Sequence, residues 1–184
     1  LFTEITEHVK TGRRTGLRTF YDAVTDWSAE FDERLKPDGR SRGLSTGIRS
    51  LDELLGVKRI VRGSLFVIGA RPKMGKTTLY TQMGINCATV ENEPALMFSL
   101  EMPEGQMVEK ITAQKGRISP NLFYPDMTKD DYGYRGDWNG DLKKATGVMG
   151  ALIDTNNLLI DDTPGISLAH VMAESRRIKR ERGK

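Results

Sequence analysis

The sequence has few of the residues that build disulfide frameworks and metal centres. It contains one cysteine, Cys87, among 184 residues, and its two histidines are His8 and His170. A single cysteine cannot form an internal disulfide, and this set cannot assemble a cluster of Cys and His ligands. We therefore exclude a disulfide-stapled module and a zinc domain. We expect Cys87 to be a small buried side chain in a protein of a reducing compartment.

Long hydrophobic runs are also missing. No apolar stretch approaches the roughly 20 residues that a membrane-spanning helix needs, so we expect a cytoplasmic protein without a membrane partner. The chain begins at Leu1 rather than Met, and no basic and then apolar leader opens it. We therefore expect no secretory signal, and a fragment or a processed chain.

Charge is nearly balanced. The net charge is +3, and 29% of the residues are charged while 38% are hydrophobic. This small positive charge permits an anionic partner such as nucleic acid without requiring one. The length allows a sizeable core, and we expect one globular domain with an appendage.

The most informative stretch is SLFVIGARPKMGKTTLY, from Ser64 to Tyr80, in which an apolar run leads directly into MGKTT. A strand buried on both faces, a phosphate-binding loop and a helix follow one another in this order in P-loop proteins. The leading position departs from the usual pattern, because Ala70 stands where glycine is common. An ordinary turn with a solvated lysine is the alternative, and the flanking strand and helix favour a nucleotide site.

The residue types of this loop suit a bound phosphate. Backbone N–H groups of the loop can surround the phosphates, Lys76 can reach the β- and γ-phosphates, and the Thr77 hydroxyl can ligate Mg²⁺. The positive end of the following helix adds to the attraction. The predicted nucleotide-binding residues are Arg71, Pro72, Lys73, Met74, Gly75, Lys76, Thr77 and Thr78.

An amphipathic helix is predicted from about Gly16 to Lys36. One apolar stripe repeats at steps of three or four along it, formed by Leu17, Phe20, Val24, Trp27, Phe31 and Leu35. Pro37 and a polar stretch that reads as a linker follow, so we assign residues 1–42 to a linker region and 43–184 to a globular domain. The stripe can pack on its own core or dock on another subunit, and both interpretations stay open.

Strand and helix signals alternate in the globular domain. Short apolar runs predict strands at 64–70, 95–100 and 157–160, and periodic segments predict helices at 76–90, 103–116 and 168–182. We expect Ser167 to cap the last of these helices, and Ser50 with Glu53 to form a capping box in a short helix within 44–55. The stretch 124–141 reads as irregular. This alternation predicts an α/β fold with a parallel sheet flanked by helices.

Glu101 follows the second predicted strand. Ligands of open parallel sheets lie beyond the carboxyl ends of the strands. A carboxylate there can position and polarise the water that attacks a γ-phosphate. The alternative is a solvated or helix-capping glutamate ahead of Pro103, and the position alone leaves both open.

The segments ARPKMGKTT, FSLEMP, LLIDDTPGIS and SRRIKRERG together resemble the ATPase domain of DnaB-type replicative helicases, which are ring-forming motors with a RecA-like core. The opening GLSTGIRSLDELLGVKRIVRGSLFVI is similar too, and Ala70 belongs to that family's form of the loop. The resemblance covers nearly the whole chain and is weakest from Leu122 to Val148. Bacterial and phage helicases share the pattern.

This resemblance implies a RecA-like P-loop ATPase that translocates on single-stranded DNA and unwinds duplex during replication. It implies that Lys76 and Thr77 bind the phosphates of ATP and Mg²⁺, and that Glu101 is catalytic together with Lys76. The helix at 16–36 becomes the linker helix, which packs against the adjacent subunit of a hexamer. Primase and a helicase loader are further partners that the resemblance suggests.

In that family the domain continues into a Walker B strand, DNA-binding loops and an arginine finger. We therefore expect this chain to be a fragment with an incomplete sheet. An arginine finger contributes roughly 10³ to 10⁵ in turnover in related P-loop enzymes, so we expect the chain alone to hydrolyse nucleotide barely, if at all. The alternatives are a non-motor P-loop module that regulates or loads a helicase ring, and a RecA-like recombinase.

The acidic pair after the third predicted strand and the basic run of the last helix can each be interpreted in two ways. Asp161 and Asp162 end an apolar strand as a Walker B magnesium site does. The family places them one strand earlier, which favours a turn through Thr163 to Gly165. The basic run of the last helix reads as a solvated helix end or, less readily, as a DNA contact; it comprises Arg176, Arg177, Lys179, Arg180, Arg182 and Lys184.

An aromatic group in the irregular stretch is the last candidate. Tyr132, Tyr134 and Trp138, with Arg135, have the chemistry to stack on bases. Nothing in their spacing favours this over a surface loop, and we assign them no role.

Overall fold

The computed structural model describes residues 16–35, 43–56 and 59–182. The chain divides into two compact units, Leu1–Arg42 and Gly43–Lys184. Among the described residues, no helix combines the length and the apolar character that crossing a bilayer requires.

The described part of the first unit is dominated by the helix α2 (Phe20–Arg34). Its start is fixed by Thr19, whose hydroxyl accepts a hydrogen bond from the Asp22 backbone at 3.2 Å and donates one to the Asp22 carboxylate at 2.7 Å. The predicted stripe is exposed: Phe20 is 85% exposed and Trp27 is 52% exposed, although Trp27 stacks on Phe31 with ring centroids 5.1 Å apart. This helix therefore presents an open apolar face.

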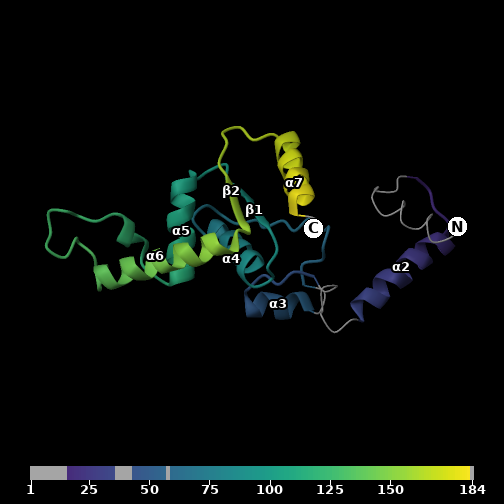
Figure 1. Ribbon diagram of the computed structural model, residues 1–184, viewed down its shortest axis with the longest axis horizontal. Coiled ribbons are helices and arrows are strands. Elements are labelled where there is room, and N and C mark those ends of the chain that lie inside the picture. Colours follow the sequence, from purple (N-terminus) through teal and green to yellow (C-terminus); the bar gives the residue numbers. More distant parts are fainter. Residues whose placement is uncertain (1–15, 36–42, 57–58, 183–184) are drawn as a thin grey trace. The chain divides into compact units, whose positions relative to one another are not determined.

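The second unit is an α/β domain (Figure 1). Its strands β1 (Ala95–Phe98) and β2 (Leu158–Asp161) pair in parallel, with Ala95 opposite Leu158 and Phe98 opposite Asp161. The helices are α3 (Arg49–Leu55), α4 (Lys76–Thr89), α5 (Glu104–Gly116), α6 (Trp138–Thr155) and α7 (Leu168–Arg182), with a short 3₁₀ helix η2 (Pro120–Phe123). The α/β prediction is confirmed, as are the helices expected at 76–90, 103–116 and 168–182.

The main core lies where α4 and α5 pack against β1. Ile85, Met97, Met107 and Ile111 are each at most 2% exposed and form one cluster. Burial alternates along β1, so that Ala95 and Met97 are buried while the residues between and after them are half-buried. This packing holds the start of α4 beside the carboxyl end of β1, which is where the candidate site lies.

A second core cluster joins α6 to the segment before it. It consists of Ile118, Leu122, Tyr134 and Ala145, all buried. The Tyr134 hydroxyl donates to the Asp141 carboxylate at 2.7 Å, and Tyr132 contacts the ring of Trp138 with centroids 4.5 Å apart. Tyr134 is thus a core residue, in line with the interpretation that gave these aromatics no role in stacking.

The apolar run 64–70 is not a strand in the structure, and the prediction of a strand buried on both faces was wrong. Leu65 is 89% exposed and Val67 is 78% exposed. A strand needs a neighbour that pairs with its backbone N–H and C=O groups. The two strands of the described sheet pair with each other, and the run 64–70 does not pair with either of them.

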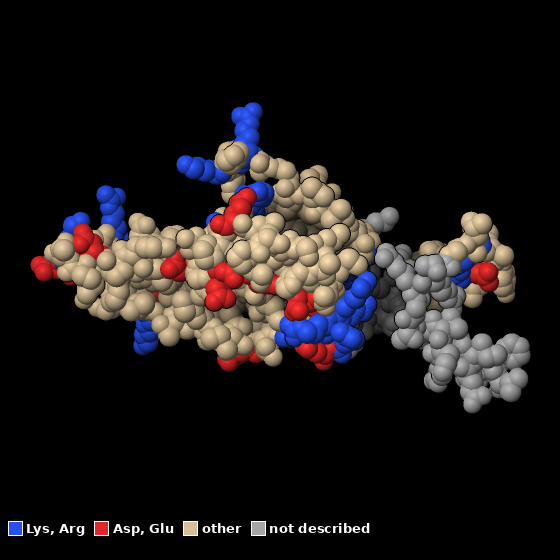
Figure 2. Space-filling model, turned by 90° about the horizontal axis from the view of Figure 1, so that it is seen from above, with Lys and Arg blue, Asp and Glu red and all other residues tan. Residues whose placement is uncertain are grey.

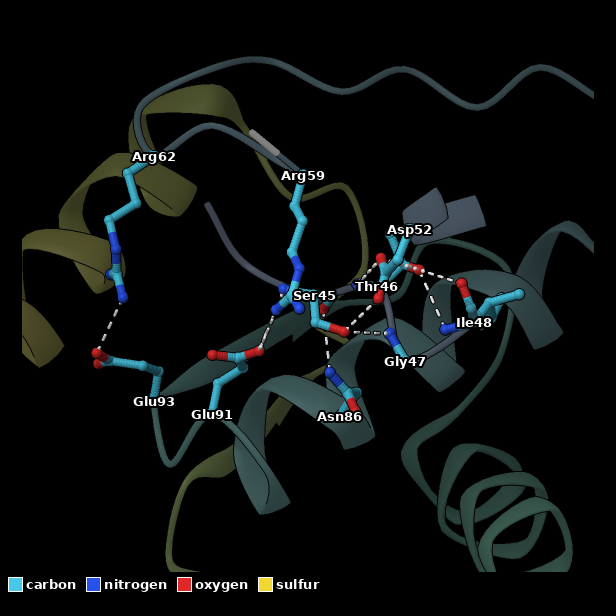
Figure 3. Close-up of polar contacts among 10 residues, drawn as sticks. All are labelled: Ser45, Thr46, Gly47, Ile48, Asp52, Arg59, Arg62, Asn86, Glu91 and Glu93. Carbon is cyan, nitrogen blue, oxygen red and sulfur yellow. Dashed lines mark hydrogen bonds and ion pairs between the residues drawn. The ribbon is translucent and has the colours of Figure 1, made fainter. Parts of the chain in front are cut away.

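The capping box expected at Ser50 and Glu53 was also wrong. Helix α3 begins after Ile48, whose side chain makes no cap bond, and Glu53 pairs with Arg49 at 2.8 Å. Asp52 instead accepts hydrogen bonds from the backbone and hydroxyl of Thr46, both at 2.8 Å (Figure 3). The other predicted cap is confirmed, because the Ser167 hydroxyl accepts from the His170 backbone at 3.2 Å.

Candidate functional site

The loop of residues 71–75 makes a tight turn into α4. The Met74 backbone donates to the Arg71 carbonyl at 3.3 Å, and both Lys73 (φ 63°) and Gly75 (φ 87°) are left-handed. A side chain is strained in that conformation, whereas glycine adopts it freely. Gly75 is the N-cap residue of α4, so this glycine lets the chain turn directly from the loop into the helix.

The first turn of α4 offers unpaired donors to an anion. The first helical bond of α4 joins the Leu79 backbone N–H to the Gly75 carbonyl at 2.9 Å, and the N–H groups that precede it in a helix have no intrahelical acceptor. The loop and Lys76 are exposed. These donors, the helix dipole and the Lys76 ammonium fit a phosphate group, and the half-buried Thr77 carries a hard oxygen that suits Mg²⁺.

Lys76 and Glu101 lie together, although they come from different elements. The Lys76 Nζ is 3.7 Å from Glu101 Oε1, and the two side chains are 49% and 74% exposed. Lys76 opens α4 and Glu101 follows β1, so the packing of α4 on β1 brings them to one place. The structure therefore joins the two residues that the sequence proposed as catalytic.

Glu101 sits in a short turn, residues 99–104, which we call the Glu101 turn. The Ser99 hydroxyl donates to the Met102 carbonyl at 2.7 Å and accepts from the Met102 backbone N–H at 3.1 Å. The turn is also tied to the end of β2, because the Ser99 N–H donates to the Asp161 carbonyl and the Glu104 N–H donates to Asp162 Oδ2, both at 2.8 Å.

Asp161 ends β2, and Asp162 leads into a turn at Pro164 and Gly165, as the favoured interpretation predicted. Asp161 Oδ1 accepts from the Thr163 backbone at 2.9 Å, and Asp161 Oδ2 lies 2.7 Å from His170 Nε2. Hydrogen bonds from Thr163 and then from His170 lower the pKa of Asp161 to about 2. Over the part of the chain that the structure describes, no cluster of three acidic, His or Cys residues could hold a metal.

Gln114 links the phosphate-loop helix to α5, and the sequence analysis did not identify it. The Gln114 amide nitrogen donates to the Thr78 carbonyl and to Gln82 Oε1, both at 3.0 Å, while its oxygen accepts from the Thr81 hydroxyl at 2.8 Å. Thr81 is fully buried and also donates to the Thr77 carbonyl at 2.9 Å. A lone glutamine in a helix carries no sequence signal for such a contact.

Part of the basic run on α7 is engaged within the domain. Arg177 pairs with Glu174 at 2.7 Å and with Glu181 at 3.0 Å. Arg182 donates to Asn157 Oδ1 at 2.9 Å. On the face shown in Figure 2, basic and acidic side chains are interspersed. These contacts support the interpretation of a charged helix surface rather than a DNA contact.

Comparisons with known proteins place the second unit in a family context. Residues 43–184 match the family model described as the DnaB-like helicase C terminal domain. The replicative DNA helicase DnaB of Geobacillus stearothermophilus is 35% identical over 147 residues, covering 79% of this chain and 30% of that protein. The replicative DNA helicase DnaC of Bacillus subtilis (strain 168) is 34% identical over 146 residues, covering 79% and 29%.

A solved structure of an ATPase domain has the same fold. It superposes with a TM-score of 0.69 at 21% identity, covering 90% of this chain and 54% of that one. This match confirms the predicted RecA-like fold. The chain spans 30% of the length of the first curated relative.

Proposed function

The chain belongs to the family of DnaB-like helicase C-terminal domains, and from this membership we propose that the protein is an ATP-driven replicative DNA helicase. Residues 43–184 form the N-terminal part of its ATPase domain, and residues 1–42 form a linker region. The helicase is a cytoplasmic ring that translocates on single-stranded DNA and unwinds duplex.

The structural observation that carries the proposed ATPase site is the approach of Lys76 Nζ to Glu101 Oε1, 3.7 Å apart at the start of α4. Lys76 binds the β- and γ-phosphates of ATP, and the backbone of the loop from Arg71 to Gly75, with Thr78, surrounds the phosphates. Thr77 ligates Mg²⁺, which when bound neutralises developing phosphate charge. Glu101 orients and polarises the attacking water.

The exposed stripe of α2 supports the proposed assembly. Leu17 is 107% exposed and Leu35 is 66% exposed, so the apolar face runs along the whole helix. Monomeric soluble proteins rarely leave such a face open. We propose that this face docks on a neighbouring subunit of a homohexamer, and that primase and a helicase loader bind the assembled ring.

The test uses the complete gene product and a forked DNA duplex with a fluorescent strand. Lys76→Ala is expected to abolish strand separation and to weaken binding of a fluorescent ATP analogue, because the lysine contacts phosphate. Glu101→Gln is expected to keep nucleotide binding while ATP turnover falls by roughly 10² to 10⁴, the contribution typical of general base catalysis. Lys144→Ala and Glu53→Gln, at exposed positions on α6 and α3, are the matched controls.

Different outcomes discriminate between the functions. Strand separation that depends on ATP and on Lys76 supports a helicase. ATP binding without turnover or unwinding in the unmodified protein would replace the motor with a non-motor module that regulates or loads a ring. Turnover that persists in Glu101→Gln would remove Glu101 from the catalytic role.

A further inference from the structure

The Glu101 turn is anchored at both ends to the acidic pair that closes β2. Its first residue, Ser99, donates its N–H to the Asp161 carbonyl, and its last residue, Glu104, donates its N–H to Asp162 Oδ2, each at 2.8 Å. Glu101 lies between these two bonds. Asp161 and Asp162 thus hold the Glu101 turn at both ends, and Glu101 is the carboxylate proposed to orient water.

The two anchors differ in kind. The Ser99 bond continues the parallel ladder of β1 and β2, so any residue at position 161 can make it through its backbone. The Glu104 bond needs a side-chain acceptor at position 162. A carboxylate bonded to a backbone N–H at a helix start is charge-assisted and complements the helix dipole, so Asp162 supplies the one side-chain tie between this turn and β2 among the contacts described here.

The orientation of Glu101 depends on this turn because little else restrains it. The Glu101 side chain is 74% exposed, and its contact with Lys76 is long at 3.7 Å. The position of the Glu101 carboxylate is therefore set mainly by the backbone of the Glu101 turn. A displacement of about 1 Å in a reacting group can lower turnover about 10²-fold, so a loose turn would matter.

We propose that Asp162 is a positioning residue for the hydrolytic step, which holds the Glu101 turn through the Glu104 N–H. This proposal rests on the proposed function, in which Glu101 orients water. It gives a role to Asp162, which with Asp161 resembles a Walker B site in sequence but precedes a turn. The alternative role for Asp162 is a plain helix cap, which stabilises α5 without affecting the chemistry.

The experiment compares Asp162→Ala, Asp162→Asn and Ser99→Ala in the complete gene product. ATP turnover and nucleotide affinity are measured separately, and amide hydrogen exchange is followed in the peptide that contains residues 99–104. Asp154→Ala, at an exposed position near the end of α6, is the matched control.

Asp162→Ala is expected to lower kcat by about tenfold or more, the scale of a misplaced catalytic group, while KM and nucleotide affinity stay within about twofold. Exchange in the Glu101 turn should rise. Asp162→Asn keeps an oxygen acceptor and is expected to restore most of kcat and of the protection. Ser99→Ala, which loses the bonds to Met102, should show the same separation of kcat from KM.

Each result decides between the roles. If Asp162→Ala lowers thermal stability and leaves kcat unchanged, Asp162 is a plain cap and the proposal is wrong. If Asp162→Ala does not fold, Ser99→Ala and Asp162→Asn decide it, and normal kcat in Ser99→Ala with exchange in the turn raised would overturn the proposal. Absence of ATP turnover in the unmodified protein would refute the proposed function itself, which separates that failure from this one.

Discussion

Replacing Gly47 by alanine is expected to destabilise the second unit by about 2 to 5 kcal/mol, the sum of a backbone and a side-chain cost. Gly47 has a φ of +75°, and an added Cβ would lie 2.7 Å from both Cβ and Cγ of Asn86. These atoms are the base of the Asn86 side chain and cannot swing away. Asn86 is 8% exposed and donates to the Ser45 carbonyl at 3.0 Å (Figure 3).

The magnitude follows from these two effects. A non-glycine residue in the left-handed region costs about 1 to 2 kcal/mol. Displacing Asn86 breaks its hydrogen bond to Ser45, and a buried polar group left unpaired costs about 1 to 3 kcal/mol. Gly63→Ala separates the two effects, because Gly63 also has a positive φ, of +79°, but an added Cβ there would meet nothing within 4 Å.

The assay is urea denaturation of the chain at equilibrium, followed by far-UV circular dichroism. Gly47→Ala should lose clearly more stability than Gly63→Ala. In an Asn86→Gly background both clashing carbons are gone, so the added methyl should cost only about as much as it does at Gly63. Equal losses at Gly47 and Gly63 in the unmodified background would refute the packing argument.

Two further predictions concern the site and its surroundings. Gln114→Ala should weaken binding of a fluorescent ATP analogue by about threefold to tenfold and lower the free energy of unfolding by about 1 to 3 kcal/mol, because it removes the hydrogen bonds of Gln114 to Thr78, Thr81 and Gln82. Gln106→Ala, at an exposed position on α5, should do neither, and unchanged affinity in Gln114→Ala would contradict the link between Gln114 and the phosphate-binding loop. The pKa of Asp161 is lowered to about 2 from 3.8, so its contribution to stability is present above about pH 4 and is lost as pH falls toward 2. In Asp161→Asn the melting temperature should therefore fall less between pH 4 and pH 2 than it does in the unmodified chain. An equally steep fall in both proteins would contradict this.

Local sequence signals predicted what local interactions determine. The phosphate loop was predicted because Gly75 and Lys76 stand at the junction between a loop and a helix, and the structure places a left-handed turn there. Ser167 caps α7 as predicted, since a cap bond spans three residues. A hydrogen bond between residues that are close along the chain can be predicted, because one short segment of sequence contains both the donor and the acceptor.

The failures have different causes, and only the one at 64–70 depends on a distant partner. Ser50 resembles a cap as well as Ser167 does, but its helix begins elsewhere because Asp52 bonds to Thr46 instead. Helix α6 was missed because three glycines, Gly140, Gly147 and Gly150, weaken its pattern; Asp137 starts it by accepting from the Gly140 backbone at 3.0 Å. The run 64–70 has the composition of a strand, yet a strand exists only beside a partner.

The proposed catalytic pair depends on the same distinction between local and distant restraints. An exposed ion pair contributes about 0 to 1 kcal/mol, and the 3.7 Å contact of Lys76 with Glu101 belongs to this weak class because both side chains are largely in solvent. Lys76 can therefore exchange Glu101 for a phosphate oxygen at little cost. Glu101 then loses its partner but keeps its place, because the bonds of its turn to β2 do not involve Lys76. A carboxylate held by its backbone and released by its lysine is free to accept a hydrogen bond from water.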